Sequence, residues 1–384
     1  MHIGFLAPEF PPMLGGMAEL ARGLAAGLAA EDRVSLFCLP RHGIDGPWKR
    51  VGEVTGRRQR DLPPLLALEQ SQAAPDVWLA MNAGLVPLAP HLRRPFFAYF
   101  HGNDFTNPWL ACGPRVLEAV KRPYAAQIRH PLRRRAIARA LPWVVHTLTN
   151  SEQTRSLIVE RLPVAAETVS VVHPGVGDAF FQDGASGDGH ARPDGGPLRI
   201  LTVTRLSSHT RRKNVDGVLE ALSRIGGDID FRYRVVGDGD DRPRLEALSR
   251  KLGLGDRVHF TGKVDEDGLL AAYRGADLFI LASKATEQDV EGFGIVYIEA
   301  AASGVPSICS RAGGATDAVD EAHNGLLIDD SSPASIADGI RRFVAERGRF
   351  SPRAIKAYAE GFRWPRIAGQ LRAALVKHLP AGAG

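Results

Sequence analysis

The chain has 384 residues, of which 44% are hydrophobic and 24% charged, and its formal net charge is +5 at pH 7. These proportions are ordinary for a soluble globular protein, and no apolar run approaches the ~20 residues of a membrane-spanning helix. The three cysteines, Cys38, Cys112 and Cys309, are too far apart for a zinc-ligand cluster or a convincing disulfide framework. Residues 1–7 form a strand-like run without the basic start of a signal peptide, so we expect a cytoplasmic protein.

The first half of the chain alternates short β-like runs with helical stretches. A Pro- and Gly-containing turn at residues 11–16 separates the first strand from an Ala- and Leu-rich helix at 17–30. Strands are expected at residues 3–7, 33–39, 77–80, 96–100, 144–150 and 168–173. Strands separated by helices predict βαβ units and a parallel sheet.

The composition changes at residues 183–197, which are rich in Gly, Asp and Pro and lack an apolar period. This segment is expected to be a linker or a surface loop. A second alternation follows, with strands expected at 198–204, 231–236, 258–261, 278–282, 307–310 and 325–328 and helices at 215–225, 242–251, 269–274 and 353–378. The last helix is expected to break at Trp364-Pro365. The pattern predicts two Rossmann-like domains in tandem, with ligands at the carboxyl ends of the strands and a cleft between the two domains.

The most informative string runs from Glu291 to Glu299 and reads Glu-Gly-Phe-Gly-Ile-Val-Tyr-Ile-Glu. A Gly-x-Gly turn that opens a helix presents backbone N–H groups and a positive dipole end, which suit an anionic phosphate. Carboxylates that faced the phosphate would repel it, whereas they accept hydrogen bonds from sugar hydroxyls. The string therefore predicts a nucleotide sugar as the ligand. The alternative is a buried Ala-rich helix with two incidental glutamates.

Together with Gly304-Val305-Pro306, this string resembles the signature of retaining glycosyltransferase family 4. The resemblance implies the α/β fold called GT-B, in which two Rossmann-like domains face each other across a cleft. The implied domains are an acceptor domain at 1–182, a linker at 183–197, a nucleotide-sugar-binding domain at 198–364, and a helix at 365–384 that crosses back to the first domain.

The resemblance also assigns roles to charged residues of the second half. Glu291 would hold the hydroxyls of the donor sugar, and Glu299 would hold the ribose. Arg205 and Lys213 follow the first strand of this half and would clamp the diphosphate, because fixed cations stabilise the charge that develops on it. Their spacing is longer than in many family members, so Arg212 is a rival for the role of Lys213. In isolation, the same loop could be a solvated basic loop.

His101 follows a strand of the first half, and the resemblance implies that its side chain faces the reacting centre. A histidine at a strand end is otherwise often a capped or partly buried residue. Gly313-Gly314 resembles a Gly-Gly-x-x-Glu segment of the family, although Asp317 stands where the glutamate would be. The other donor-binding assignments are Gly16, Phe293, Gly294, Ile295 and Val264.

We expect transfer of a hexose from a GDP-mannose, UDP-glucose or UDP-N-acetylglucosamine type of donor to the hydroxyl of a sugar, a lipid-linked saccharide or a small molecule. No cofactor is expected, and no metal, because Asp238-Gly239-Asp240 follows a strand as a local turn. The chain lacks a G-x-G-x-x-G after its first strand, which argues against a dehydrogenase. Two alternatives are an epimerase of sugar nucleotides with the same fold and a non-catalytic partner subunit.

Residues 121–139 form a helical stretch in which basic and apolar side chains interleave. Such a stretch could rest on anionic headgroups at the inner face of the membrane. Alternatively, its apolar side chains pack it onto its own domain and its charges form a solvated face. We expect no nucleic-acid partner.

Overall fold

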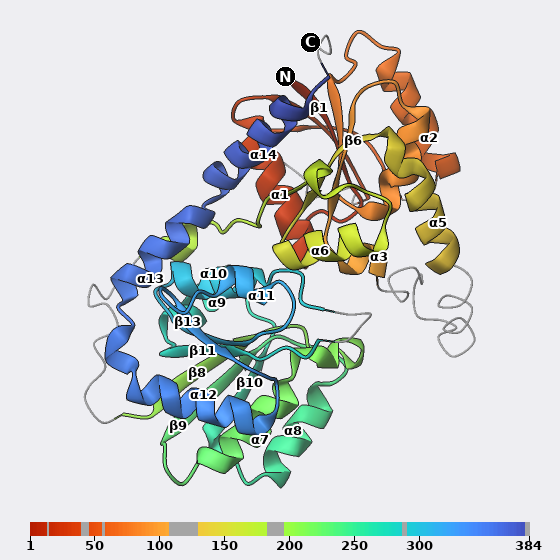
Figure 1. The fold of residues 1–384 in the computed structure, drawn as a ribbon. Coiled ribbons are helices and arrows are strands. Elements are labelled where there is room, and N and C mark those ends of the chain that lie inside the picture. Colours follow the sequence, from red (N-terminus) through yellow and green to blue (C-terminus); the bar gives the residue numbers. More distant parts are fainter. Residues whose placement is uncertain are drawn as a thin grey trace. The chain divides into compact units, whose positions relative to one another are not determined.

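The computed structural model describes residues 1–13, 15–39, 46–55, 58–106, 130–182, 196–285 and 290–380. The chain divides into two compact units (Figure 1). The first unit comprises Met1–Gly175 and Trp364–Gly384, and the second comprises Val176–Arg363. Of the linker expected at 183–197, residues 183–195 lie outside the described part of the chain.

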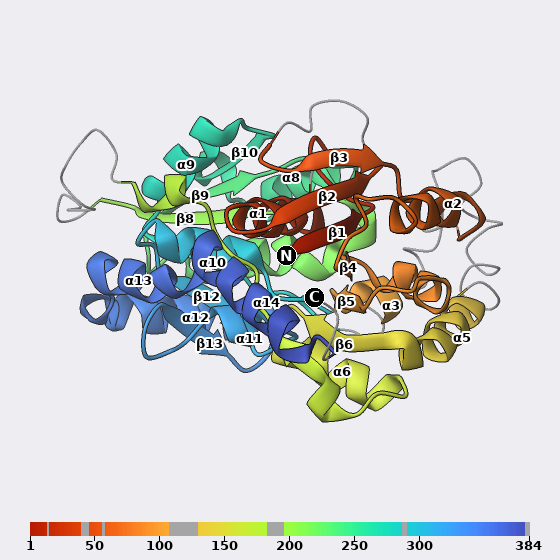
Figure 2. The ribbon, with the colours of Figure 1, turned by 90° about the horizontal axis from the view of Figure 1, so that it is seen from above.

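In the described part of the first unit, parallel strands form a seven-stranded sheet in the order β3-β2-β1-β4-β5-β6-β7 (Figure 2). The strands are β1 (His2–Ala7), β2 (Arg33–Cys38), β3 (Lys49–Gly52), β4 (Val77–Ala80), β5 (Phe96–Phe100), β6 (Val144–Thr149) and β7 (Val169–Val171). Six of them lie where the sequence predicts strands. The seventh, β3, is a four-residue edge strand with exposed and half-buried side chains, so it lacks the apolar pattern of a buried strand.

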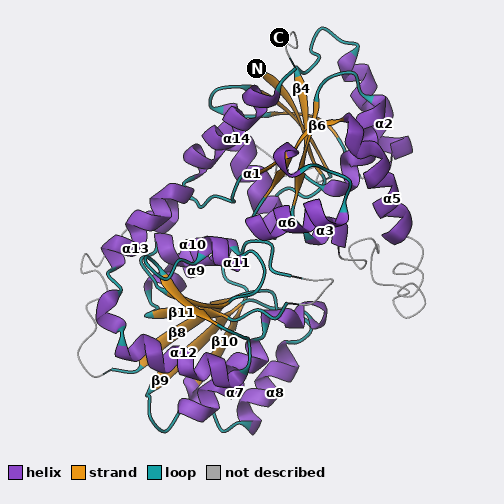
Figure 3. Cartoon of the chain, viewed as in Figure 1, coloured by secondary structure: helices purple, strands orange, loops and turns teal. Residues whose placement is uncertain are grey.

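Helices cover both faces of this sheet (Figure 3). They are α1 (Gly16–Ala29), α2 (Arg58–Glu69), α3 (Asn103–Thr106), α5 (His130–Ala140), α6 (Glu152–Arg161) and α14 (Trp364–His378). Helix α14 packs against α1, where a β-carbon on Gly23 would lie 2.2 Å from the Trp364 ring and one on Gly27 would lie 2.3 Å from the Ala368 β-carbon. The two glycines share one face of α1, so their missing side chains allow the last helix to join the first unit.

In the second unit, the described parallel strands form a six-stranded sheet in the order β10-β9-β8-β11-β12-β13. The strands are β8 (Leu198–Val203), β9 (Phe231–Val236), β10 (Val258–Gly262), β11 (Leu278–Leu281), β12 (Ser307–Ser310) and β13 (Gly325–Ile328). The helices are α7 (Val215–Ile225), α8 (Arg242–Lys251), α9 (Glu266–Arg274), α10 (Ile295–Ala302), α11 (Ala315–Ala318), α12 (Pro333–Ala345) and α13 (Pro352–Ala359). All six strands lie where the sequence predicts them.

In both sheets the strand order reverses beside the first strand of the unit. Strand β1 lies between β2 and β4, and β8 lies between β9 and β11. Ligands of doubly wound sheets bind at the carboxyl ends of the strands beside such a reversal. In the second unit, the loop after β8 carries Arg205, and the loop after β11 carries Glu291.

The break in the last helical stretch lies just before Trp364 and not at Pro365. Helix α13 ends at Ala359, a 3₁₀ turn covers Glu360–Phe362, and α14 begins at Trp364. Pro365 therefore occupies the first turn of α14, where the missing N–H has no intrahelical partner to lose.

Candidate functional site

The carboxylate of Glu291, between β11 and α10, is the centre of a buried ion-pair cluster. Its Oε2 accepts a hydrogen bond from Arg212 Nη1 at 3.0 Å and another from the Lys213 ammonium, and the Ser283 hydroxyl donates to it at 3.4 Å. Burial of the carboxyl opposes its ionisation, but Lys213 and Arg212 outweigh this effect and hold the pKa of Glu291 at about 2. Glu291 is therefore an ionised hydrogen-bond acceptor at neutral pH.

A 3₁₀ turn, η7 (Ser208–Lys213), brings the two cations to Glu291. Asn214 ends this turn with a left-handed φ of 57°. Its Nδ2 donates to the carbonyl oxygens of Ala282 at 2.9 Å and Ser331 at 2.8 Å. The bond to Ala282 ties the loop after β8 to the loop after β11, and the bond to Ser331 ties it to the loop after β13. Lys213 thereby meets a carboxylate 78 residues away in sequence. The sequence left open whether Arg212 or Lys213 has the role at the diphosphate. In the structure both side chains contact Glu291.

Two glycines shape the backbone around Glu291. Gly313 has a φ of +67°, and a β-carbon there would lie 2.5 Å from the Glu291 carbonyl oxygen. The N–H of Gly314 donates to that same oxygen at 2.7 Å. Gly294 precedes α10 with a φ of +83°, and a β-carbon there would lie 2.5 Å from the Tyr297 ring. Gly313 thus allows a close approach to the backbone of Glu291, and Gly314 forms a hydrogen bond with that backbone.

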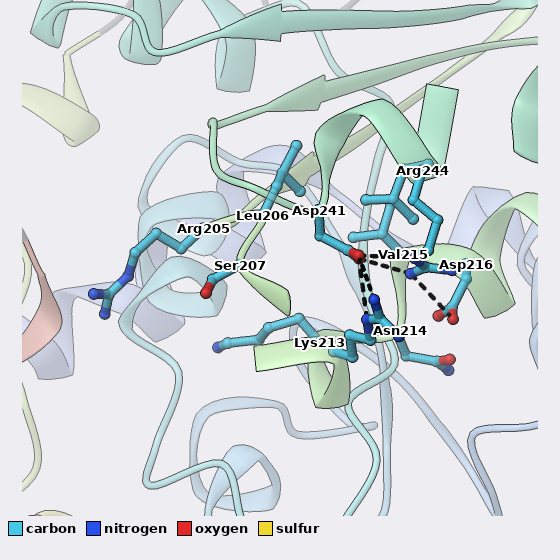
Figure 4. A pocket seen from close by; sticks show the side chains of 11 residues that line it. Arg205, Leu206, Ser207, Lys213, Asn214, Val215, Asp216, Asp241 and Arg244 are labelled. Carbon is cyan, nitrogen blue, oxygen red and sulfur yellow. Dashed lines mark hydrogen bonds and ion pairs between the residues drawn. The ribbon is translucent and has the colours of Figure 1, made fainter. Parts of the chain in front are cut away.

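A shallow pocket lies beside the cluster, and Arg205 and Lys213 are among the side chains that line it (Figure 4). On its other side, Asp241 accepts hydrogen bonds from Arg211 and Arg244. Arg205 and Lys213 extend away from that ion-paired group (Figure 4). Arg205 and Lys213, the two residues assigned to the diphosphate, therefore line the same pocket, and the ion-paired Asp241 lines its other side.

Glu299 lies in α10, and its side chain is held by a residue that the sequence did not single out. The hydroxyl of Tyr273, on α9, donates to Glu299 Oε2 at 2.7 Å. A tyrosine in an amphipathic helix is usually a core aromatic, so no sequence signal separates Tyr273 from other buried tyrosines.

The other residues assigned to the donor differ in exposure. The Phe293 side chain is buried in the core of the second unit, and its ring lies 6.0 Å from the Phe362 ring. Ile295 is the first residue of α10, where helix N–H groups lack intrahelical acceptors. Val264, in the loop between β10 and α9, is 38% exposed.

His101 and Gly16 belong to the first unit and follow strand ends there. The side chain of His101 is buried, and its Nε2 lies 2.8 Å from the carbonyl oxygen of Met81. A carbonyl oxygen only accepts, so Nε2 carries the hydrogen and Nδ1 is the acceptor of the neutral ring. Gly16 is exposed at the first position of α1.

The aspartates that imitate a metal motif form local contacts. Asp240 accepts hydrogen bonds from the Ser208 backbone at 3.0 Å and from its hydroxyl at 2.5 Å, and Asp238 lies 3.9 Å from Arg242. Across the described ranges, no group of three or more His, Cys, Asp or Glu side chains could hold a metal ion.

Part of the basic stretch, residues 121–129, lies outside the described residues, and the rest, residues 130–139, lies in α5. Ile137 is fully buried, and Arg134 donates to a carbonyl at the end of α6 at 3.1 Å, so one side of α5 packs onto its own unit. Exposed side chains of α5 include Leu132, Arg135 and Arg139, and Trp143 is exposed in the 3₁₀ turn Leu141–Trp143 that follows. No helix in the described part of the chain is long and apolar enough to cross a membrane.

The second unit therefore combines cations, an ionised carboxylate and a helix N-terminus at the reversal of strand order. Cations and helix N–H groups suit an anionic phosphate, and a carboxylate suits hydroxyl groups. The fold and site therefore define a doubly wound α/β protein whose second unit suits a ligand with both phosphate and hydroxyl groups.

Comparisons with known proteins identify the family within this class. The model described as Glycosyltransferase Family 4 matches residues 14–180, and the one described as Glycosyl transferases group 1 matches residues 190–361. The chain is 31% identical to the GDP-mannose-dependent alpha-(1-6)-phosphatidylinositol monomannoside mannosyltransferase of Mycolicibacterium smegmatis, over 89% of this chain and 88% of that relative. It is 29% identical to the D-inositol 3-phosphate glycosyltransferase of Streptomyces bingchenggensis, over 89% of this chain and 71% of that relative. The chain belongs to glycosyltransferase family 4 and is a glycosyltransferase.

Solved structures confirm the fold class. Sucrose-phosphate synthase from Thermosynechococcus elongatus superposes with a TM-score of 0.75 at 21% identity, over 98% of this chain and 99% of the other. The Anabaena protein HepE in complex with UDP and glucose gives a TM-score of 0.70 at 19% identity, over 97% and 99%. The expected GT-B architecture, built from two parallel-sheet units, is thus confirmed.

Proposed function

We propose that this chain transfers a hexose from a nucleotide diphosphate sugar to an acceptor hydroxyl and retains the anomeric configuration. The observation that carries the proposal is the ionised Glu291 carboxylate, held by Lys213 and Arg212 beside a pocket that Arg205 also lines. GDP-mannose is the first donor to test, because the relative from Mycolicibacterium smegmatis is named as GDP-mannose-dependent.

In the proposed reaction, Arg205, Lys213 and Arg212 neutralise the diphosphate as negative charge grows on it. Glu291 accepts hydrogen bonds from the hydroxyls of the donor sugar, and Glu299 accepts those of the ribose. The acceptor oxygen forms a bond to the anomeric carbon on the face from which the diphosphate departs. The proton of the acceptor hydroxyl passes to the leaving diphosphate, so no side chain of the enzyme forms a covalent intermediate.

A donor panel tests this proposal. GDP-mannose, UDP-glucose and UDP-N-acetylglucosamine are each added to the wild-type chain, and the melting temperature is measured. A donor at 100 times its Kd stabilises a protein by about 2.7 kcal/mol. The stabilising donor is then incubated with phosphatidylinositol monomannoside or D-inositol 3-phosphate, because relatives are named for these compounds.

Three results would overturn the proposal. They are a panel without stabilisation or transfer, a product of inverted anomeric configuration by NMR, and conversion of the donor sugar in the absence of any acceptor. The last result would indicate an epimerase.

We also propose that the acceptor is carried by a lipid and that α5 contacts the membrane surface. Arg135 and Arg139 are exposed beside the exposed Trp143, and cationic and aromatic side chains together suit an anionic lipid interface. Replacing both arginines with Gln should weaken salt-sensitive binding to anionic vesicles. Replacing the exposed Arg232 and Arg234 of β9 with Gln is the charge-matched control. Equal loss in both variants, or no binding of the wild type at low salt, would contradict the membrane contact.

A further inference from the structure

Tyr273 is a buried phenol whose hydroxyl points at a site carboxylate. Its side chain is fully buried in α9, and the rings of Phe180 and Phe279 lie 5.8 and 5.9 Å from its ring. Its hydroxyl donates to Glu299 Oε2 at 2.7 Å and lies 3.3 Å from the carbonyl oxygen of Val296. A phenol has one hydrogen to donate, so the shorter contact, to the carboxylate, is the dominant one.

This phenol stays protonated under all ordinary conditions. Burial, and then the negative charge of Glu299, raise the pKa of Tyr273 well above its usual range. The hydroxyl is therefore a permanent donor, and its bond to an ionised acceptor belongs to the stronger, charge-assisted kind. Because the ring is fully buried and lies close to two other aromatic rings, the donor position is restrained, and it restrains the rotation of the Glu299 carboxylate.

We infer that Tyr273 is a positioning residue that orients Glu299 to accept the hydroxyls of the donor ribose. The inference rests on the proposed role of Glu299. A carboxylate offers about four acceptor positions, so Glu299 can accept hydrogen bonds from the phenol and from ribose hydroxyls together. Orientation before binding reduces the entropy lost when the nucleotide binds. Tyr273 thereby contributes to selection of nucleotides that carry ribose hydroxyls.

The test compares a ribonucleotide with its analogue that lacks both ribose hydroxyls. The Kd values of GDP and 2′,3′-dideoxy-GDP are measured by calorimetry for the wild type and for Tyr273→Phe, with UDP and its dideoxy analogue in parallel. The wild type should prefer the ribonucleotide. Tyr273→Phe should weaken ribonucleotide binding about tenfold and change dideoxynucleotide binding less than twofold, because only the first ligand uses the oriented carboxylate.

Tyr233→Phe is the matched control. Tyr233 is equally buried in the same unit, and its hydroxyl donates to Thr202 Oγ1 at 2.8 Å. This variant loses a buried phenol hydroxyl but should keep the wild-type preference for ribose. In a Glu299→Gln background, Tyr273→Phe should have little further effect on that preference, because coupled residues are not additive.

Each other outcome is informative. Equal weakening of both nucleotides by Tyr273→Phe, or an unchanged preference, would overturn the positioning role. A wild type that binds ribonucleotide and dideoxynucleotide equally would instead refute the ribose role of Glu299. Failure of the wild type to bind GDP or UDP would refute the proposed function and the inference with it.

Discussion

Replacing Glu291 with Gln should reveal how much the buried ion-pair cluster stabilises the second unit. The substitution keeps the shape of the side chain but removes the charge that faces Lys213 and Arg212. In the folded chain, the pKa of Glu291 is about 2, against an ordinary value of 4.5. This difference corresponds to about 3 kcal/mol of stability at neutral pH, which agrees with the cost of about 3–5 kcal/mol for removing one partner of a buried ion pair.

The pH dependence has a definite sign. Because the folded-state pKa of Glu291 is depressed, its stabilising contribution is complete above about pH 4.5 and is lost as the pH falls toward 2. The difference in unfolding free energy between the wild type and Glu291→Gln should therefore shrink by about 1 kcal/mol between pH 7 and pH 4.

Urea denaturation followed by tryptophan fluorescence at pH 7, 5 and 4 measures this difference. The control is Glu246→Gln, which removes a partly exposed carboxylate that accepts from Arg242 Nε at 2.7 Å. Exposed pairs contribute about 0–1 kcal/mol, so this control should lose less stability than Glu291→Gln at pH 7. A loss in Glu291→Gln no larger than in the control, or a difference that grows as the pH falls, would refute the reasoning.

Gly313→Ala should destabilise the chain by about 2 kcal/mol or more and reduce turnover, because a β-carbon would lie 2.5 Å from the Glu291 carbonyl oxygen at a φ of +67°. Gly348→Ala, where a β-carbon meets nothing within 4 Å, should change the melting temperature little; similar losses in both would argue against the steric explanation. Lys213→Glu should abolish transfer, measured after correction for hydrolysis of the donor, because the new carboxylate would repel the diphosphate. Lys213→Arg keeps the positive charge and should keep part of the activity. Transfer should survive EDTA, because cations take the place of a metal; loss of activity that Mg²⁺ or Mn²⁺ restores would contradict this.

Local patterns in the sequence predicted most of the strands of both sheets. The buried strands β4 and β5 are continuous apolar runs, and they lie at the residues predicted for them. The edge strand β3 was not predicted, because its side chains are exposed or half-buried and show no apolar pattern. It is a strand because it pairs with β2. The packing of α14 on α1 likewise depends on Gly23 meeting Trp364, a contact between opposite ends of the chain.

For the site, the sequence by itself determined the kinds of group and their places after strands. The Glu291 to Glu299 string predicted a phosphate-and-sugar ligand, because charge type and turn chemistry are local properties. The resemblance to family 4 assigned the basic loop from Arg205 to Lys213 to the diphosphate. Tertiary structure alone decided that Lys213 and Arg212 both contact the carboxylate of Glu291. It also decided that Gly313 lies against the backbone of Glu291 and that Tyr273 donates a hydrogen bond to Glu299. These relations join residues on different strands and helices, and their energies depend on burial and on distances of about 3 Å, which no linear spacing specifies.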